Sequence, residues 1–200
     1  MRAIDALAKE FSRLPGIGAR QARRLVYHLL SREPGYLEAL ARLLEGLAAE
    51  RAQCASCKRF FEGKGELCDL CRDLEREGTT LMVLEKDIDL EAMEKSGVFH
   101  GRYFLLGGLI PILEKNPSER IRIKELVGGL AKRKGFKEVI IALSANVEGD
   151  NTALYVAKTL EPLAKKNGFK VTRLGRGLST GTELEYSDQE TLRSALGNRK

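Results

Sequence analysis

The sequence predicts an α/β protein, with a helical unit before the α/β part and a small metal-binding segment between them. Three observations predict this architecture. Apolar residues recur at helical spacing through residues 1–51. All four cysteines then fall within residues 54–71. From residue 78 to residue 174, short apolar runs alternate with helical segments, which is typical of a parallel sheet covered by helices.

The first part of the chain predicts three helices, each with an apolar stripe along one face. We expect them at residues 3–12, 20–30 and 36–51. The pairs Pro15-Gly16 and Pro34-Gly35 separate them, because proline and glycine interrupt helices. The three helices form a compact unit that ends at the first cysteine pair.

The rest of the chain predicts four strands, with helices between them and a short arm at the end. The strands are expected at 81–85, 102–106, 139–143 and 169–174, and the helices at 90–96, 118–134, 151–167 and 188–196. We expect four parts: a helical domain at 1–52, a zinc finger at 53–77, an α/β domain at 78–172 and a C-terminal arm at 173–200.

The four cysteines form two pairs with the same spacing. Cys54 and Cys57 are followed, ten residues later, by Cys68 and Cys71. Two such pairs can present four thiolates to one Zn²⁺ at distances of about 2.3 Å. Four thiolates leave no open position for a substrate, so the sequence predicts one structural zinc ion. Two disulfides are the alternative, but the start of the chain has no apolar signal segment, which favours a reducing compartment.

The turn between the first two helices predicts a phosphate-binding site. It reads Leu14-Pro15-Gly16-Ile17-Gly18, and glycine at both positions permits positive φ and close approach to another group. The unpaired N–H groups of the next helix, with its dipole, favour an anion. This is the signature of a helix-hairpin-helix that grips the DNA backbone without reading bases, and a tight turn between packed helices is the alternative. The candidate DNA-binding residues are Gly16, Gly18, Arg20, Arg23 and Arg24.

Carboxylates follow two of the predicted strands. The C-terminal ends of parallel strands meet at one edge of a sheet, where ligands bind, so these side chains are candidate Mg²⁺ ligands. The candidates are Glu85, Asp89, Glu148 and Asp150. In the alternative interpretation Asp87, Asp89 and Glu148 sit at helix N-termini and favour the dipole. Residue types alone leave both interpretations open.

The composition favours an acidic partner and disfavours a membrane-spanning segment. The formal charge is +6, which suits a polyanion such as nucleic acid. Hydrophobic residues make up 43% of the chain, enough for real cores. No apolar run approaches the roughly 18 residues that a membrane-spanning helix needs. We therefore expect a soluble cytoplasmic protein with no membrane partner.

Together these motifs resemble the RecR family of bacterial recombination mediators. The resemblance is carried by the hairpin turn at 14–18, the cysteine quartet, the motif at 147–150 and shorter matches at 101–104 and 184–196. It implies a Toprim fold for the α/β domain and no enzymatic turnover. It also implies a homo-oligomer, commonly a ring tetramer, or a dimer, that clamps DNA, with the arm from about Arg173 packed against a neighbouring subunit.

The resemblance also implies partners and residue roles. Members of the family act with RecO and in places RecF to load RecA recombinase onto single-stranded or gapped DNA, so we expect a nucleoid-associated protein. On this model Arg20 and Arg24 face DNA, and Glu148 lies at a position implicated in partner contact or possible Mg²⁺ binding. The alternative function is a metal-dependent Toprim nuclease that uses Glu85 with the Glu148/Asp150 pair.

Overall fold

The computed structural model describes residues 2–133 and 135–199, which form two compact units. The first unit runs to residue 51 and includes residues 62–64. The second unit holds residues 52–61 and the chain from residue 65 onward.

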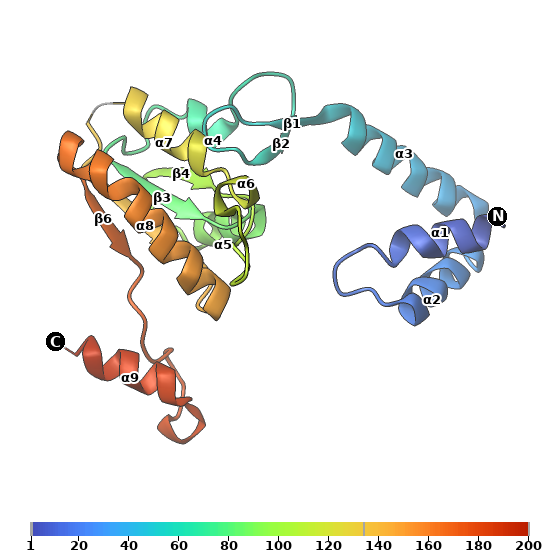
Figure 1. Cartoon of the computed structure of the whole chain (residues 1–200). Helices are drawn as coiled ribbons and strands as arrows, with labels where there is room; N and C mark the ends of the chain where they lie inside the picture. The colour runs from blue at the N-terminus through green and yellow to red at the C-terminus, as the bar shows by residue number, and fades with distance from the viewer. Residues whose placement is uncertain (1, 134, 200) are drawn as a thin grey trace. The chain divides into compact units, whose positions relative to one another are not determined.

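The first unit contains three helices, as the periodicity predicts. They are α1 (Ala3–Phe11), α2 (Ala19–Leu30) and α3 (Pro34–Glu50). Helices α1 and α2 pack side by side, and the buried residues of α2 are Ala22 and Val26 (Figure 1). Helix α3 buries none of its residues, although its sequence is amphipathic.

The cysteine segment contains short elements that the sequence pattern does not reveal. Strands β1 (Arg51–Gln53) and β2 (Phe60–Glu62) form a two-stranded sheet, and α4 (Asp69–Arg72) is a single helical turn. Three or four residues are too few to show a hydrophobic period, so the sequence could not predict them.

The main sheet has four strands, all parallel, in the order β4-β3-β5-β6. The strands are β3 (Thr80–Leu84), β4 (Arg102–Leu105), β5 (Glu138–Ala142) and β6 (Lys170–Arg173). Each lies within one residue of its predicted position. From β3 the chain moves to one side for β4 and to the other side for β5 and β6, so the order reverses between β3 and β5. In open parallel sheets ligands bind at such a point.

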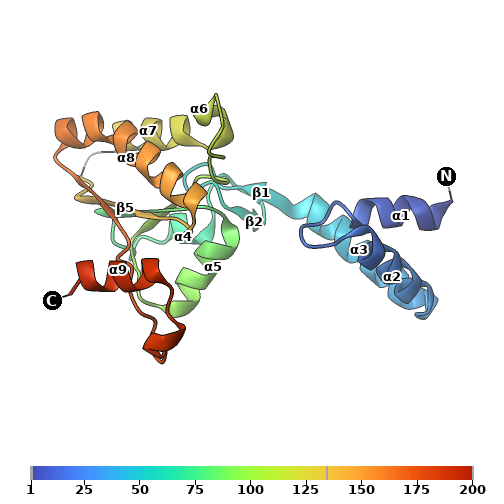
Figure 2. The ribbon, with the colours of Figure 1, turned by 60° about the horizontal axis from the view of Figure 1, so that its bottom comes forward.

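Side chains that alternate along the strands divide the core between the two faces of the sheet. One face carries Leu81, Val83 and Phe104 and packs on α7 (Ile123–Lys132) and α8 (Val147–Asn167). The other face carries Met82, Leu84 and Leu105 and is covered by α5 (Asp87–Ser96) and the cysteine segment (Figures 1 and 2).

Three predicted helices differ from the structure. The helix expected at 90–96 is α5, which begins earlier, at Asp87. The segment expected as one helix at 118–134 is α6 (Pro117–Arg120) and then α7, and residue 134 lies outside the described residues. The chain is extended at Ile121, where the neighbouring Arg122 N–H donates to the Leu106 carbonyl, so strand-like pairing interrupts the helix. Helix α8 begins at Val147 instead of residue 151, which places the acidic motif inside its first turn.

The C-terminal arm follows β6 and contains η1 (Leu184–Tyr186) and α9 (Gln189–Gly197). Asp188 caps α9 by accepting hydrogen bonds from the Glu190 and Thr191 N–H groups, which confirms the predicted final helix. None of the described helices combines the length and the apolar character required to cross a membrane.

Candidate metal centre and nucleic-acid interface

The four cysteine side chains come together in the second unit. Their sulfur atoms all lie within 4.8 Å of one another, and Cys57 Sγ is 3.6 Å from Cys68 Sγ. Ligands at about 2.3 Å in a tetrahedron are about 3.8 Å apart, so this spacing suits zinc. All four cysteines are free, so the disulfide alternative is not adopted.

Backbone hydrogen bonds shape the two turns that carry the sulfur atoms. The Lys58 N–H donates to the Cys54 carbonyl and the Cys71 N–H donates to the Cys68 carbonyl, each at 3.0 Å. The Cys68 N–H also donates to Cys54 Sγ, 3.4 Å away, which links the two cysteine turns. In the described part of the chain, this is the only group of three or more Cys, His, Asp or Glu side chains close enough to share an ion. The residues therefore fit one zinc ion in a closed shell.

The close packing of the cysteines shifts the pKa values of their thiols in opposite directions. The hydrogen bond with Cys57 lowers the pKa of Cys71 to about 5, and the same contact, with burial, raises the pKa of Cys57. Burial raises the pKa of Cys68 to about 11. One thiolate is thus stabilised by the thiols that remain protonated. Zinc binding replaces those protons, so it releases them to solvent and depends on pH.

The cysteine segment is bonded to the sheet on which it packs. The Leu105 N–H donates to the Cys57 carbonyl at 2.8 Å, and the Phe60 N–H donates to the Asp87 carboxylate at 2.7 Å. The Arg102 guanidinium donates to the carbonyls of Leu70 and Cys71. These bonds make the metal centre part of the cover of one sheet face.

The hairpin turn in the first unit has the geometry of a type II turn. The Ile17 N–H donates to the Leu14 carbonyl at 3.1 Å, and Gly16, at the third position, has φ +77°. Of the two glycines only Gly16 uses a positive φ, because Gly18 has φ −79° and serves as the N-cap of α2. Gly18 offers no capping side chain, so the first N–H groups of α2 are open to an anion.

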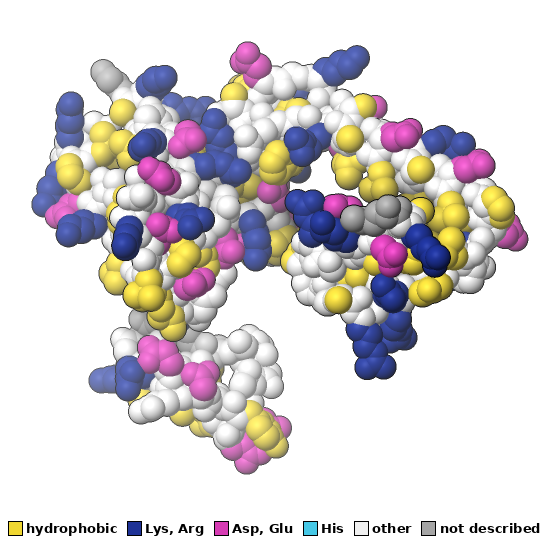
Figure 3. All heavy atoms as spheres, turned by 45° about the vertical axis from the view of Figure 1, so that its right-hand side comes forward, with side chains coloured by type: hydrophobic (Ala, Val, Ile, Leu, Met, Phe, Trp, Pro, Cys, Tyr) yellow, Lys and Arg dark blue, Asp and Glu magenta, His cyan; other side chains and the backbone are white. Residues whose placement is uncertain are grey.

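The three candidate arginines of α2 differ in their surroundings. All are exposed, and Arg23 donates to the Asp5 carboxylate of α1 at 3.1 Å. Arg20 and Arg24 form no ion pair with another described residue. They lie one turn apart on the same face of α2, next to the open N–H groups. In Figure 3 Lys and Arg side chains project together from the helical unit.

The candidate acids near β3 form hydrogen bonds or ion pairs with other residues of the chain. Glu85, directly after β3, accepts a hydrogen bond from Ser144 Oγ at 2.7 Å and pairs with Lys86 at 3.3 Å. Asp89 accepts from the Lys86 N–H as part of the capping box of α5. For Asp89 the helix-capping interpretation is the one that the structure supports.

The pair Glu148 and Asp150 occupies the first turn of α8. Residues two apart on a helix do not face each other, so these carboxylates point in different directions. Glu148 is exposed, whereas Asp150 pairs with Arg173 and Arg176. The hydrogen bonds from Arg176, and those from Arg173, hold the pKa of Asp150 below its usual value. Among the described residues the four acids are therefore not gathered around one position.

Three residues near the carboxyl edge of the sheet form structural contacts that the sequence pattern does not predict. Thr152 is fully buried, and its Oγ1 accepts from the Ile110 N–H at 2.8 Å and donates to the Glu148 carbonyl at 2.7 Å. Arg173 and Arg176 bind Asp150 across more than 20 residues of sequence. No periodic or short-range signal in the sequence marks such a pair, because both partners are brought together only when β6 docks beside β5.

Comparison with known proteins matches both units of the chain. Residues 4–47 match the family model for the RecR helix-hairpin-helix, and residues 79–175 match the model for the Toprim domain. The recombination protein RecR of Thermus thermophilus is 46% identical over 97% of this chain and 94% of its own length. The RecR of Chloroflexus aggregans is 41% identical, over 98% and 93% respectively. The RecR of Chlorobium phaeobacteroides is 39% identical, over 98% and 96%.

Proposed function

Because the chain belongs to the RecR family of recombination proteins, we propose that it is a DNA-binding scaffold of recombinational repair without catalytic turnover. It acts with RecO-like and RecF-like mediators to load a RecA-type recombinase onto single-stranded or gapped DNA. It works in the cytoplasm at the nucleoid, as a homo-oligomer that is a ring tetramer or a dimer.

The hairpin is the observation that carries this proposal. An uncapped helix N-terminus, an open type II turn and two arginines free of ion pairs with described residues form a compact anion site. Every one of these groups can bind phosphate, and none is arranged to read base edges. Binding is therefore independent of sequence and strongly dependent on salt.

The acid arrangement supports a scaffold over the competing nuclease. A two-metal or one-metal nuclease needs carboxylates that converge on one position. In this chain Glu85 and Asp150 are held by neighbouring side chains, Glu148 is exposed, and among the described residues no three of these acids are close enough to share an ion. We propose that Glu148 serves partner contact, since it is exposed and forms no ion pair with another described residue.

The test is the salt dependence of DNA binding by the variant Arg20→Ala/Arg24→Ala. Removing two phosphate contacts reduces the magnitude of the negative slope of log K against log salt by about 1.8 on duplex DNA. The control is Arg42→Ala in α3 of the same unit, an exposed arginine beside Glu38, which leaves the slope unchanged. Equal slopes for the double variant and the wild type would remove the hairpin from the DNA interface.

A second measurement addresses catalysis. Labelled single-stranded and gapped DNA is incubated with the protein and Mg²⁺ or Mn²⁺, and the fragments are resolved by size. We expect intact DNA. Fragments that disappear with Glu85→Gln would establish the nuclease instead of the scaffold.

A further inference from the structure

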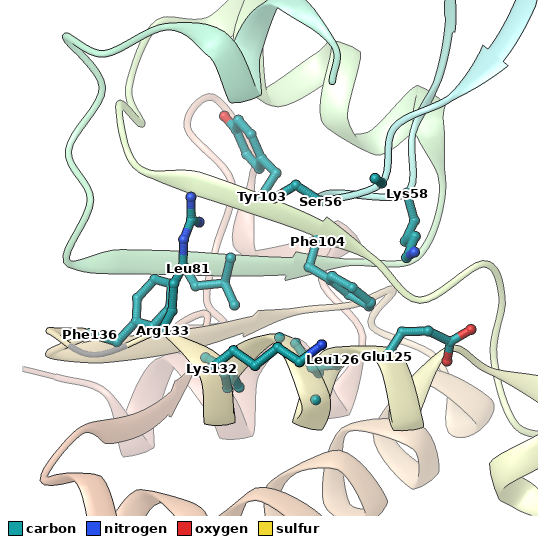
Figure 4. A pocket seen from close by; sticks show the side chains of 14 residues that line it. Ser56, Lys58, Leu81, Tyr103, Phe104, Glu125, Leu126, Lys132, Arg133 and Phe136 are labelled. Atoms are coloured by element: carbon teal, nitrogen blue, oxygen red, sulfur yellow. The ribbon is translucent and has the colours of Figure 1, made fainter. Parts of the chain in front are cut away.

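A groove of about 470 Å³ lies in the second unit, between the edge strand β4, helix α7 and the first cysteine turn (Figure 4). Its floor is apolar, formed by Leu81, Phe104, Leu126, Leu130 and Phe136. It is separate from the carboxyl edge of the sheet and from the hairpin. Neither the metal centre nor the proposed DNA contact uses it.

One residue of the strand edge beside the groove has open backbone groups. Strand β4 is the outermost strand, and its Leu105 N–H points away from β3 to the Cys57 carbonyl. Since backbone groups alternate along a strand, the N–H and C=O of Tyr103 lie on the same outer edge. Neither group is hydrogen-bonded to another residue that the structure describes. The outer groups of Leu105 are taken, because its N–H donates to the Cys57 carbonyl and its own carbonyl accepts from Arg122. The open pair at Tyr103 can bind the backbone of one residue of an extended peptide.

Cations surround the groove. Lys58, Lys132 and Arg133 line it, and none forms an ion pair with another described residue. A single carboxylate, Glu125, lies at one end, and Figure 4 shows the side chains of Lys58 and Lys132 reaching toward the space between β4 and α7. The surface is therefore complementary to negative charge.

Two local features around the groove lower the stability of the fold. Lys58 has φ +68°, the one positive value at a non-glycine position in the described chain, where glycine would be relaxed. Gly128 and Gly129 lie in the middle of α7, and a Cβ at either position would meet nothing within 4 Å. Alanine there would strengthen the helix, so the two glycines keep the groove wide at a cost to stability.

We propose that this groove binds an extended acidic peptide segment of a partner protein. The segment pairs with the open backbone groups of Tyr103 in β4 and places a bulky apolar side chain between β4 and α7. Its carboxylates lie against Lys58, Lys132 and Arg133. A nucleic acid fits less well, because Phe104 and Phe136 are 5% and 8% exposed and offer little ring face for stacking. Paired backbone groups at a strand edge are matched by another peptide.

The experiment uses the zinc-loaded full chain and fluorescein-labelled hexapeptides of alternating aspartate and phenylalanine, with binding followed by fluorescence anisotropy. The matched probes replace aspartate by asparagine or by lysine. We expect the acidic peptide to bind best, and hydrogen exchange at residues 102–105 to slow when it is bound. Lys58→Gly weakens binding by up to about fivefold, while Lys166→Ala, an exposed cation on α8, leaves it unchanged.

Gly129→Leu is the decisive variant, because Gly129 lines the groove and a Cβ at this position meets nothing within 4 Å. We expect an unchanged or raised melting temperature and at least tenfold weaker peptide binding. Equal affinity in this variant, or no preference for the acidic probe, overturns the proposal. A second test uses a single-stranded thymidine dodecamer and the Arg20→Ala/Arg24→Ala variant. The proposal is also overturned if this DNA binds the variant, its binding is weakened by Lys58→Gly, and the peptides do not bind.

Discussion

At the scale of single residues, Gly149 shows how a missing side chain positions the acidic motif. A Cβ at this position would lie 1.9 Å from the Ser144 carbonyl oxygen. Its N–H donates to Asn146 Oδ1, the N-cap of α8, at 2.7 Å. Its φ is not positive, so close contact and not conformational freedom requires glycine here. This contact lets α8 start directly beside the end of β5.

We predict that Gly149→Ala destabilises the protein by about 3 kcal/mol or more, because rigid backbone must move to admit the methyl group. Thermal unfolding measures the effect. The control is Gly128→Ala, which has open space in a helix and should stabilise by about 0.5–1 kcal/mol. A melting temperature for Gly149→Ala equal to that of the wild type would contradict the contact.

Arg76 and Glu94 form the most buried ion pair among those described. Two hydrogen bonds of 2.9 and 2.7 Å join them, and Arg76 also donates to the Gly101 carbonyl and lies 5.2 Å from the Tyr103 ring centre. Burial by itself raises the pKa of Glu94, but the hydrogen bonds and charge of Arg76 outweigh it, so the pKa lies below its usual value. The pair joins the end of the cysteine segment to α5.

This pair predicts a dependence of stability on pH. A carboxylate with a lowered pKa in the folded state stabilises above its unfolded pKa of about 4.3, and the stabilisation is lost as the pH falls through the folded value. We expect Glu94→Gln to lower the unfolding free energy by about 3 kcal/mol at pH 7 and by much less near pH 3. Denaturant titrations of both proteins in the same buffers measure the difference, and zinc loss at low pH affects both proteins equally and so cancels. If the difference in unfolding free energy between the two proteins were the same at pH 3 and pH 7, the Arg76–Glu94 pair would not be its source.

At the scale of elements, the cysteine segment takes the place of a helix. Its three buried cysteines pack against Met82, Leu84 and Leu105, on the face opposite α7 and α8. The stretch 51–72, with two three-residue strands and one helical turn, has little core of its own. The zinc ion therefore supplies the cross-links that hold this cover on the sheet.

We predict one zinc ion per chain and a fall in melting temperature of more than 10 °C when a strong chelator removes it. After chelation, the sheet face that the cysteine segment covers becomes exposed and should bind a hydrophobic dye. Cys68→Ser is expected to behave like the chelated wild type, and addition of zinc should restore only the wild type. An unchanged melting temperature on chelation would show that the cover holds without metal.

At the scale of the whole molecule, the apolar face of α3 supports the proposed homo-oligomer. In the helical unit Leu43, Leu44 and Leu47 are 71%, 59% and 53% exposed, and they share a face with Leu40. The arm adds exposed Leu184 and Tyr186. A helix with an apolar stripe and no intramolecular cover gains most from burial against a second copy.

We predict that Leu44→Lys/Leu47→Lys at least halves the mass seen by native mass spectrometry, since two lysines on this face oppose its burial. Ala49→Lys is the control, because position 49 is about 140° around the helix from position 44 and is exposed. If the double variant keeps the wild-type mass, the α3 face lies outside the subunit interface.

Much of this architecture follows from short stretches of sequence. The zinc ligands are predicted by the spacing of Cys54 to Cys71, and the hairpin by Pro15, Gly16 and the following arginines. The parallel sheet is predicted by apolar runs that alternate with helices. In each case the informative residues lie within a few positions of one another, so local geometry is sufficient to relate them.

Only the tertiary structure decides which distant groups meet. It pairs Asp150 with Arg173 and Arg176, engages Glu85 with Ser144, and leaves Glu148 exposed, whereas the sequence left metal binding and helix capping equally open. It also lays the first cysteine turn along β4 and so creates the groove beside Tyr103. The physical reason is that these contacts depend on strand order and on where α8 begins. Both are set by packing across the sheet, which no local pattern of residues encodes.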